Sequence, residues 1–334
     1  MPNPSPLLLV LDGNSLIHRT YHAGSGDPGD LEAWALRGFA RYAARAVSRL
    51  RPDAIVVGFD CPVSSERRAN YPAYKAQRPD KPGDLVAQLA AAPELLAAAG
   101  LCTVIPAGFE ADDVLASAAA HARRAGWRAI LMTSDRDAFA LIDDTTSVLR
   151  LRNGGFDEAV LIDAAALHEL CGVHPHQYLD YAALRGDPSD NLPGVRGFGA
   201  AISARLLAAL GTVDAAWADL DGDGGQAVRA AVGDVAADRL AAPESRDVVA
   251  RNRRLMRMRA DLPIPHLDGA RLPLDTARVR TALGTGGGLT LGPALWSLTA
   301  RRTPAPRAAE PHPPVFRRPV RHRREPTPGQ LSLF

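Results

Sequence analysis

The sequence predicts an α/β protein in which a doubly wound, mostly parallel sheet precedes a smaller helical domain. Through residues 7–133, short apolar runs alternate with longer helical stretches, which is typical of parallel strands joined by crossover helices. From about residue 160 onward the strand signal fades and helical segments dominate. A chain of 334 residues has room for about two domains of ordinary size. We therefore expect a sheet domain at 1–160 and a helical domain at 161–300.

The expected strands are short runs rich in branched apolar residues and bounded by Gly, Pro or Asp, a pattern typical of strands buried on both faces. They lie at 7–11, 54–59, 101–105 and 128–133. Stretches rich in Ala, Leu and Arg predict the helices between them, at 31–50, 84–99 and 111–125. The helices expected in the second domain lie at 163–170, 175–185, 200–210, 226–240 and 244–257.

The C-terminal segment has a different composition from the rest of the chain. Residues 301–329 hold eight prolines, eight arginines and almost no apolar side chains, so they cannot repay the entropy lost on folding and we expect a disordered tail. The tail carries +6, and because the whole chain carries only +2, residues 1–300 carry −4. An acidic body would bind nucleic acid poorly unless its carboxylates are gathered at a metal site whose ions reverse the local charge.

The compartment follows from the cysteines and the N-terminus. Cys61, Cys102 and Cys171 are widely spaced and odd in number, which argues against a disulfide framework and for a reducing cytoplasm. The apolar run at 7–11 lacks a basic flank and is too short for a signal peptide or a membrane span. We expect a cytoplasmic protein with no membrane segment.

Nine acidic residues follow the expected strands or the turns beside them. Ligands of an open α/β sheet bind at the carboxyl ends of the strands, so these side chains should converge there. They are Asp12, Asp60, Glu110, Asp112, Asp113, Asp135, Asp137, Asp187 and Asp190. Taken alone, each acid is better explained as a turn or helix-capping residue. As a set they require cations, and oxygen ligands select Mg²⁺ or Mn²⁺, two of which form the known arrangement for phosphodiester hydrolysis.

A basic segment at 64–81 lies between the second and third expected strands. Its cations and rings are Arg67, Arg68, Tyr71, Tyr74, Lys75 and Arg78. Cations contact phosphates and aromatic rings stack on unpaired bases, so this composition suits a single nucleic-acid strand, although a solvated charged loop is the alternative. The chain has 37 arginines and only two lysines, and both lysines lie in this segment. The presence of lysine here would be explained if a compact positive charge is needed at the scissile phosphate.

Six motifs in fixed order resemble the 5′ nuclease and flap endonuclease family, including the 5′-3′ exonuclease domain of bacterial DNA polymerase I. They cover about 190 residues, which makes the set more specific than any single motif. The motifs are LDGNSLIHRTYHA (11–23), VVGFD (56–60), RRANYPAYKAQR (67–78), GFEADDVLAS (108–117), TSDRDAFAL (133–141) and LRGDPSDNLPGVRGFG (184–199).

The resemblance implies a PIN-like fold and a 5′-3′ exonuclease or flap endonuclease that acts on DNA in replication and repair. It assigns Asp12, Asp60, Glu110 and Asp112 to a first metal and Asp135, Asp137 and Asp187 to a second, with Asp113 and Asp190 as additional acids. It assigns phosphate contacts to Arg19, Lys75 and Arg78, DNA contacts to Arg67, Tyr71 and the stacking residue Tyr74, and an arch threaded by the 5′ end to residues 61–100.

Residues 191–199 resemble the opening of the family's helix-hairpin-helix (helix-three-turn-helix). Glycines there let backbone N–H groups approach a duplex phosphate, and the family binds K⁺ at this place. The residues implied are Gly194, Arg196, Gly197 and Gly199. The family's usual Lys-Thr is replaced here by Ala201 and Ile202, which predicts weaker duplex anchoring.

The last five residues are similar to the Q-L-x-L-F peptide that docks into the bacterial β sliding clamp. An apolar cluster after a polar tail needs a pocket elsewhere, and the residues implied are Gln330, Leu331, Leu333 and Phe334. The alternative is a terminus that folds back on its own domain. We expect a monomer that binds DNA and the clamp. Two other functions remain open: a PIN-type or Toprim-type enzyme acting on RNA or DNA topology, and an inactive DNA-binding scaffold recruited to the clamp.

Overall fold

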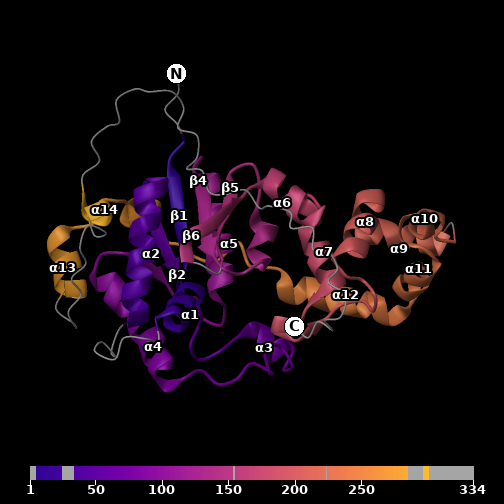
Figure 1. The fold of residues 1–334 in the computed structure, drawn as a ribbon, viewed down its shortest axis with the longest axis horizontal. Helices are drawn as coiled ribbons and strands as arrows, with labels where there is room; N and C mark the ends of the chain where they lie inside the picture. Colours follow the sequence, from indigo (N-terminus) through magenta and orange to yellow (C-terminus); the bar gives the residue numbers. More distant parts are fainter. Residues whose placement is uncertain (1–4, 25–33, 153–154, 223, 285–295, 301–334) are drawn as a thin grey trace, which may run out of the picture.

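The computed structural model describes residues 5–24, 34–152, 155–222, 224–284 and 296–300 (Figure 1). The expected tail at 301–329 and the clamp-binding residues Gln330, Leu331, Leu333 and Phe334 lie outside the described residues.

A six-stranded sheet with strand order β3-β2-β1-β4-β5-β6 forms the first domain. Neighbouring strands are parallel except β6, which runs antiparallel to β5. The strands are β1 Leu7–Asp12, β2 Ala54–Gly58, β3 Cys102–Val104, β4 Arg128–Thr133, β5 Thr146–Arg152 and β6 Gly155–Ile162. This arrangement confirms the doubly wound α/β fold. The sequence analysis missed β5 and β6, in which polar side chains interrupt the apolar pattern.

Helices cover both faces of the sheet because β1 sends alternate side chains to opposite sides. Leu9 and Leu11 pack with α1 Gly13–Ala23, α2 Trp34–Leu50 and α4 Gly83–Ala98. Leu8 and Val10 pack on the other face, in the core that includes α5 Ala111–Arg124 (Figure 1). Both faces of β1 are therefore buried, which explains its unbroken apolar sequence.

Short helices dominate the second domain, as expected. They are α6 Ala164–Cys171, α7 Tyr178–Arg185, α8 Ala200–Leu210, α9 Val213–Gly222, α10 Gln226–Val232, α11 Asp234–Ala241 and α12 Pro243–Met256. The single helix expected at 226–240 is interrupted by Gly233, whose φ of 85° ends α10. Buried Asn252 of α12 donates hydrogen bonds to the carbonyls of Ala183 and Pro193, which joins α12 to the hairpin region.

The chain returns to the sheet domain after α12, so the last part of the range expected as a helical domain, 161–300, packs with the sheet. Leu274, together with Val279 and Leu283 of α13 Thr276–Gly284 and Leu298 of α14 Trp296–Thr299, joins the core on the α2 and α4 face of the sheet. Within the described part of the chain, no single helix is long and apolar enough to cross a membrane, and α8 with α9 meets that test only as a pair bent by 72°.

The basic segment lies between the two domains. It forms α3 Glu66–Asn70 followed by turns. The backbone N–H of Lys75 donates to the carbonyl of Asp190 (3.0 Å), and Asn191 Nδ2 donates to the carbonyl of Ala73 (2.8 Å). The segment is therefore held against the helical domain beside the hairpin. The second half of the range expected as an arch is α4, which packs on the sheet domain through Leu85 and Leu96.

Candidate metal site and DNA-binding hairpin

Asp12 joins the ends of β1 and β4. It caps α1 by accepting from the backbone N–H of Ser15 (2.9 Å), and its other oxygen accepts from the Thr133 hydroxyl (2.7 Å). The same hydroxyl oxygen accepts from the backbone N–H of Asp135 (3.0 Å). Thr133 thus positions acids from two neighbouring strand ends, and the sequence analysis did not single it out.

Asn14 holds Asp60 at the end of β2. Its amide nitrogen donates to Oδ2 of Asp60 (2.8 Å), and its amide oxygen accepts from the backbone N–H of Asp60 (3.0 Å). The other carboxylate oxygen accepts from the backbone N–H of Ala111 at the start of α5 (2.9 Å). Asn14 is a functional residue that the sequence analysis missed, although its position directly after the Asp12-Gly13 pair was a usable signal.

Electrostatic effects show that acids from separate segments converge. Burial raises the pKa of Asp12 to about 7, and the charges of Asp60 and Asp135 add to the shift. Burial also raises the pKa of Asp112 well above its usual range, with further contributions from Asp135 and Asp12. The pKa of Asp137 is raised in the same way by burial and then by Asp135 and Asp187. The carboxyl edge of the sheet therefore concentrates carboxyl groups whose mutual repulsion is only partly offset by the cationic side chains beside them.

The donor chemistry of this edge fits hard divalent cations, because every converging ligand candidate is a carboxylate oxygen. The carboxylates do not converge closely enough in this structure to coordinate a single ion together. Among the residues that the structure describes, no group of three His, Cys, Asp or Glu side chains is placed so that it could hold a metal ion. The fold thus brings the acids to one edge, while the final coordination geometry is not formed.

Lys75 is a charged residue next to this acidic edge. Its Nζ lies 2.9 Å from Oε2 of Glu110 and 3.8 Å from Oδ2 of Asp190. Burial would lower the pKa of Lys75, but Glu110, Asp190 and Asp112 outweigh burial and raise it. The backbone of Lys75 has a φ of 56°, in the left-handed region. The lysine singled out in the sequence is therefore a partly buried, charged group held between two of the predicted acids.

The other predicted cations differ in how freely they could meet a phosphate. Arg78 is half exposed and forms an ion pair with Asp190. Arg19 is fixed at the sheet edge, since its nitrogens donate to the Ser134 hydroxyl and to the carbonyls of Leu151 and Arg152. Arg78 has the more accessible guanidinium of the two.

Asp113, predicted to bind metal, and Arg67, predicted to contact DNA, are paired with each other in the structure. The two residues form a bidentate ion pair with both N–O distances at 2.7 Å. The side chain of Asp113 is fully buried, and that of Arg67 is only 11% exposed. Asp113 also accepts from the backbone N–H of Glu110, which completes a capping box at the start of α5. Because its side chain is fully buried and its charge is neutralised by Arg67, Asp113 has a structural role in this arrangement.

The prediction that Tyr74 stacks on a DNA base is wrong. Tyr74 is 4% exposed, and its hydroxyl donates to Oε2 of Glu110 (3.2 Å). Its ring lies beneath Lys75 Nζ, 4.7 Å from the ring centroid. A buried ring cannot present its face to a base, so Tyr74 supports Glu110 and Lys75. Tyr71 is only partly buried, with the guanidinium of Arg251 over its ring at 5.1 Å.

The hairpin at 191–199 connects α7 to α8 through a glycine-rich turn. A β-carbon added at Gly194 would lie 2.3 Å from the carbonyl carbon of Arg185, so close backbone approach requires this glycine. Gly197 has a φ of 85°, and a β-carbon there would meet Nη1 of Arg239 at 2.3 Å. Gly199 precedes the first turn of α8, and the side chain of Arg196 is exposed. Gly194 is thus a packing glycine, whereas the accessible part of the hairpin is 196–199.

A PIN-like sheet that collects buried acids at its carboxyl edge, followed by a helical domain entered through a glycine-rich hairpin, defines the class of metal-dependent nucleases. Two family models match the chain in succession. The 5'-3' exonuclease N-terminal resolvase-like domain matches residues 7–172, and the 5'-3' exonuclease C-terminal SAM fold matches residues 173–277. The chain belongs to the 5′-3′ exonuclease family, which confirms the resemblance, the fold class and the nuclease class predicted from the sequence.

Known proteins similar to the chain include DNA polymerase I of Mycobacterium bovis, 36% identical over 263 residues that make up 78% of this chain and 28% of that protein. Thermostable DNA polymerase I of Thermus aquaticus is 38% identical over 224 residues, 65% of this chain and 26% of that protein. The chain therefore spans little more than a quarter of the length of these relatives.

Solved structures share the fold. The T5 D15 protein, co-crystallized with metal ions, matches with a TM-score of 0.61 and 22% identity over 75% of this chain and 89% of its own. The catalytic core of Rad2, in complex with DNA substrate, matches with a TM-score of 0.50 and 16% identity over 84% of this chain and 88% of its own.

Proposed function

We propose that this protein is a divalent-metal-dependent 5′-3′ exonuclease and 5′ flap endonuclease that hydrolyses DNA phosphodiesters during replication and repair. The observation that carries the proposal is the gathering of three buried carboxyls from different elements, Asp12, Asp112 and Asp137, around Asp135. Burial raises the pKa of each, and the charge of Asp135 adds to all three shifts. Family membership, and the metal ions and DNA in the structures of the T5 D15 protein and Rad2, support the same function.

We propose Mg²⁺ or Mn²⁺ as the cofactor, with more than one ion bound. The residues that would hold them are Asp12, Asp60, Glu110, Asp112, Asp135, Asp137 and Asp187. When bound, such ions supply an activated water and stabilise the leaving oxygen. Asn14 and Thr133 orient the acids Asp60 and Asp12. Lys75 would lose part of its pairing to Glu110 as that carboxylate is neutralised, which leaves a compact positive charge for the phosphate.

Duplex DNA would bind at the hairpin. Arg196 and the first turn of α8 after Gly199 offer a cation and backbone N–H groups to a backbone phosphate. The position of Arg239 beside Gly197 adds a cation that could replace the family lysine absent at Ala201. We also propose that this hairpin binds a K⁺ ion.

Digestion of a 5′-labelled flap tests the nuclease function. We expect cleavage with Mg²⁺, none with EDTA, and a loss of rate in Asp135→Asn. Asp157→Asn is the matched control, because it removes an exposed acid of β6 that pairs with Arg45 away from the acidic edge. Cleavage that persists in Asp135→Asn would contradict the proposed site, and preferential cleavage of an RNA flap would favour a PIN-type ribonuclease instead.

We also propose that Gln330, Leu331, Leu333 and Phe334 dock into the β sliding clamp, which would raise the local concentration of the nuclease at nicks. Binding of the full chain to the purified clamp should be lost in the double variant Leu333→Ala, Phe334→Ala and kept in Ser332→Ala. We further propose that the protein is a monomer located in the cytoplasm and associated with the nucleoid. Its three free cysteines suit a reducing compartment.

A further inference from the structure

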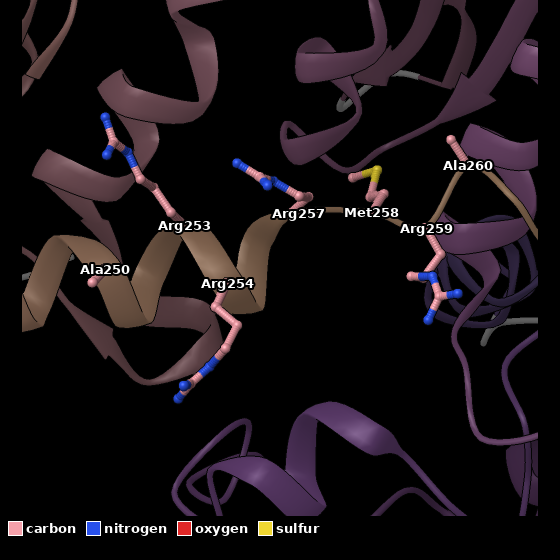
Figure 2. Close-up of a pocket in the computed structure, with 7 residues that line it drawn as sticks. All are labelled: Ala250, Arg253, Arg254, Arg257, Met258, Arg259 and Ala260. Atoms are coloured by element: carbon pink, nitrogen blue, oxygen red, sulfur yellow. The ribbon is translucent and has the colours of Figure 1, made fainter. Parts of the chain in front are cut away.

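An arginine-lined pocket of about 410 Å³ lies where α12 ends and the chain turns back toward the sheet domain. Figure 2 shows its four arginines along the end of the helix and the strand-like segment after it, with Met258 between Arg257 and Arg259. Residues 251–259 contain five arginines and no acid. The pocket is outside the acidic edge described above and has no part in the proposed chemistry.

Two of the pocket arginines already have acidic partners, and two do not. Arg253 pairs with Asp180 and Asp214, and Arg259 forms a bidentate pair with Asp261. Arg254 and Arg257 are exposed, and neither side chain has an acidic partner within the described ranges of the chain. Figure 2 shows these two side chains extending to opposite sides of the end of α12, so the pocket has a guanidinium group on each side that an anion could contact without displacing an existing ion pair.

The rest of the lining is apolar and indicates the kind of anion. Met258, Ala250 and Ala260 form a wall beside the arginines. The pocket volume falls in the range of about 300–1,000 Å³ that is usual for small ligands. A duplex presents phosphates on a ridge and needs no apolar wall, whereas an unpaired nucleotide presents a phosphate together with an exposed base face. The mixed lining therefore fits a nucleotide from a single strand.

The pocket is held at a fixed position relative to the acidic edge. Arg67 Nε donates to the carbonyl of Leu255 (2.7 Å), and the backbone N–H of Arg259 donates to Asp113 (2.8 Å). The Ser117 hydroxyl donates to the carbonyl of Arg259 (2.9 Å). Asp113 and Ser117 belong to α5, the helix whose first turn carries Asp112. A nucleotide in the pocket would thus fix a strand at a set distance from the acids.

We propose that this pocket binds an unpaired nucleotide of the single-stranded arm of the DNA substrate, with Arg254 and Arg257 contacting the phosphates on its two sides. The proposal rests on the proposed nuclease function and adds a second anchoring point for the strand that is cut.

Anisotropy titrations in EDTA test the pocket without depending on cleavage. The probes are a nicked duplex and the same duplex carrying a short 5′ flap, and the protein is the full chain as wild type or Arg254→Gln, Arg257→Gln. We expect the double variant to bind the flap substrate more weakly on the order of tenfold, since the single strand loses its two guanidinium contacts to phosphate. The slope of log K against log salt should fall by about 0.7–1.4 for one or two single-strand phosphate contacts.

The nicked duplex should bind the double variant and the wild type equally. Arg124→Gln is the control, because it removes an exposed arginine from the opposite end of α5. Equal weakening on both substrates would overturn the single-strand assignment, and unchanged flap binding would overturn the pocket itself. A failure of the nuclease proposal would be seen separately, as absent cleavage by wild type with Mg²⁺.

Discussion

Replacing Asp113 with asparagine would leave the Arg67 guanidinium without its bidentate carboxylate inside the protein. The pair is buried, with Arg67 11% exposed and Asp113 fully covered, so water cannot restore the lost interaction. Removing one partner of a buried ion pair costs about 3–5 kcal/mol. Asparagine has a single acceptor oxygen, so it cannot satisfy the backbone N–H groups of Glu110 and Arg259 together. We therefore expect a loss of about 3–5 kcal/mol in the free energy of unfolding.

Urea denaturation of the metal-free protein measures this loss, and a Mn²⁺ titration of the same variant separates structure from ligation. Because both Asp113 oxygens are engaged by Arg67 and the backbone, Asp113→Asn should bind Mn²⁺ as wild type does. Asp112→Asn is the matched variant one residue away, and it should lose Mn²⁺ affinity while keeping most of its stability. An Asp113→Asn variant that is stable but binds Mn²⁺ more weakly would refute the structural role and would support Asp113 as a metal ligand.

Four further outcomes follow from the same geometry. Asn14→Ala should weaken Mn²⁺ binding by roughly 10–100-fold in calorimetry, because Asp60 loses its orienting amide; unchanged affinity would contradict this role. Gly194→Ala should lower the free energy of unfolding by roughly 1–3 kcal/mol, since its β-carbon would overlap the Arg185 backbone, whereas Gly83→Ala, with open space around it, should not. Between pH 4 and 7 the metal-free protein should lose thermal stability as the pH rises. Folded Asp12, with a pKa of about 7, keeps a proton that the unfolded chain has already released above the ordinary value of 3.8. Mg²⁺ should restore the stability above pH 7, and a stability that rises with pH would refute the raised pKa of Asp12. Arg239→Gln should weaken binding of a nicked duplex and reduce the salt slope by about 0.9, whereas Arg124→Gln should change neither.

The sheet and the convergence of the acids were predictable from the sequence because strands buried on both faces leave a local apolar signal. The unbroken apolar run of β1 and its position at the centre of the sheet follow from burial on both faces. Asp12, Asp60 and Asp135 follow strands that the pattern identified, so their placement at one edge needed only the rule for parallel sheets.

The roles of individual side chains in the basic segment could not be predicted, because they depend on contacts between distant segments. Nothing local distinguishes Arg67, which is buried against Asp113 and the carbonyl of Leu255, from Arg78, which is half exposed. Tyr74 and Tyr71 have similar neighbours in sequence, yet only Tyr74 is buried under the site. The return of α13 and α14 to the sheet domain likewise depends on tertiary packing around Leu274 and Leu298.

The central claim is that acids from distant parts of the chain bind divalent cations at the sheet edge. Titration of the metal-free protein with Mn²⁺, followed by electron paramagnetic resonance, tests it directly. We predict that the wild type binds more than one ion and that the double variant Asp112→Asn, Asp135→Asn binds fewer ions and binds them more weakly. Free Mn²⁺ at every addition to the wild type, or identical curves for the two proteins, would contradict the metal site and the nuclease mechanism built on it.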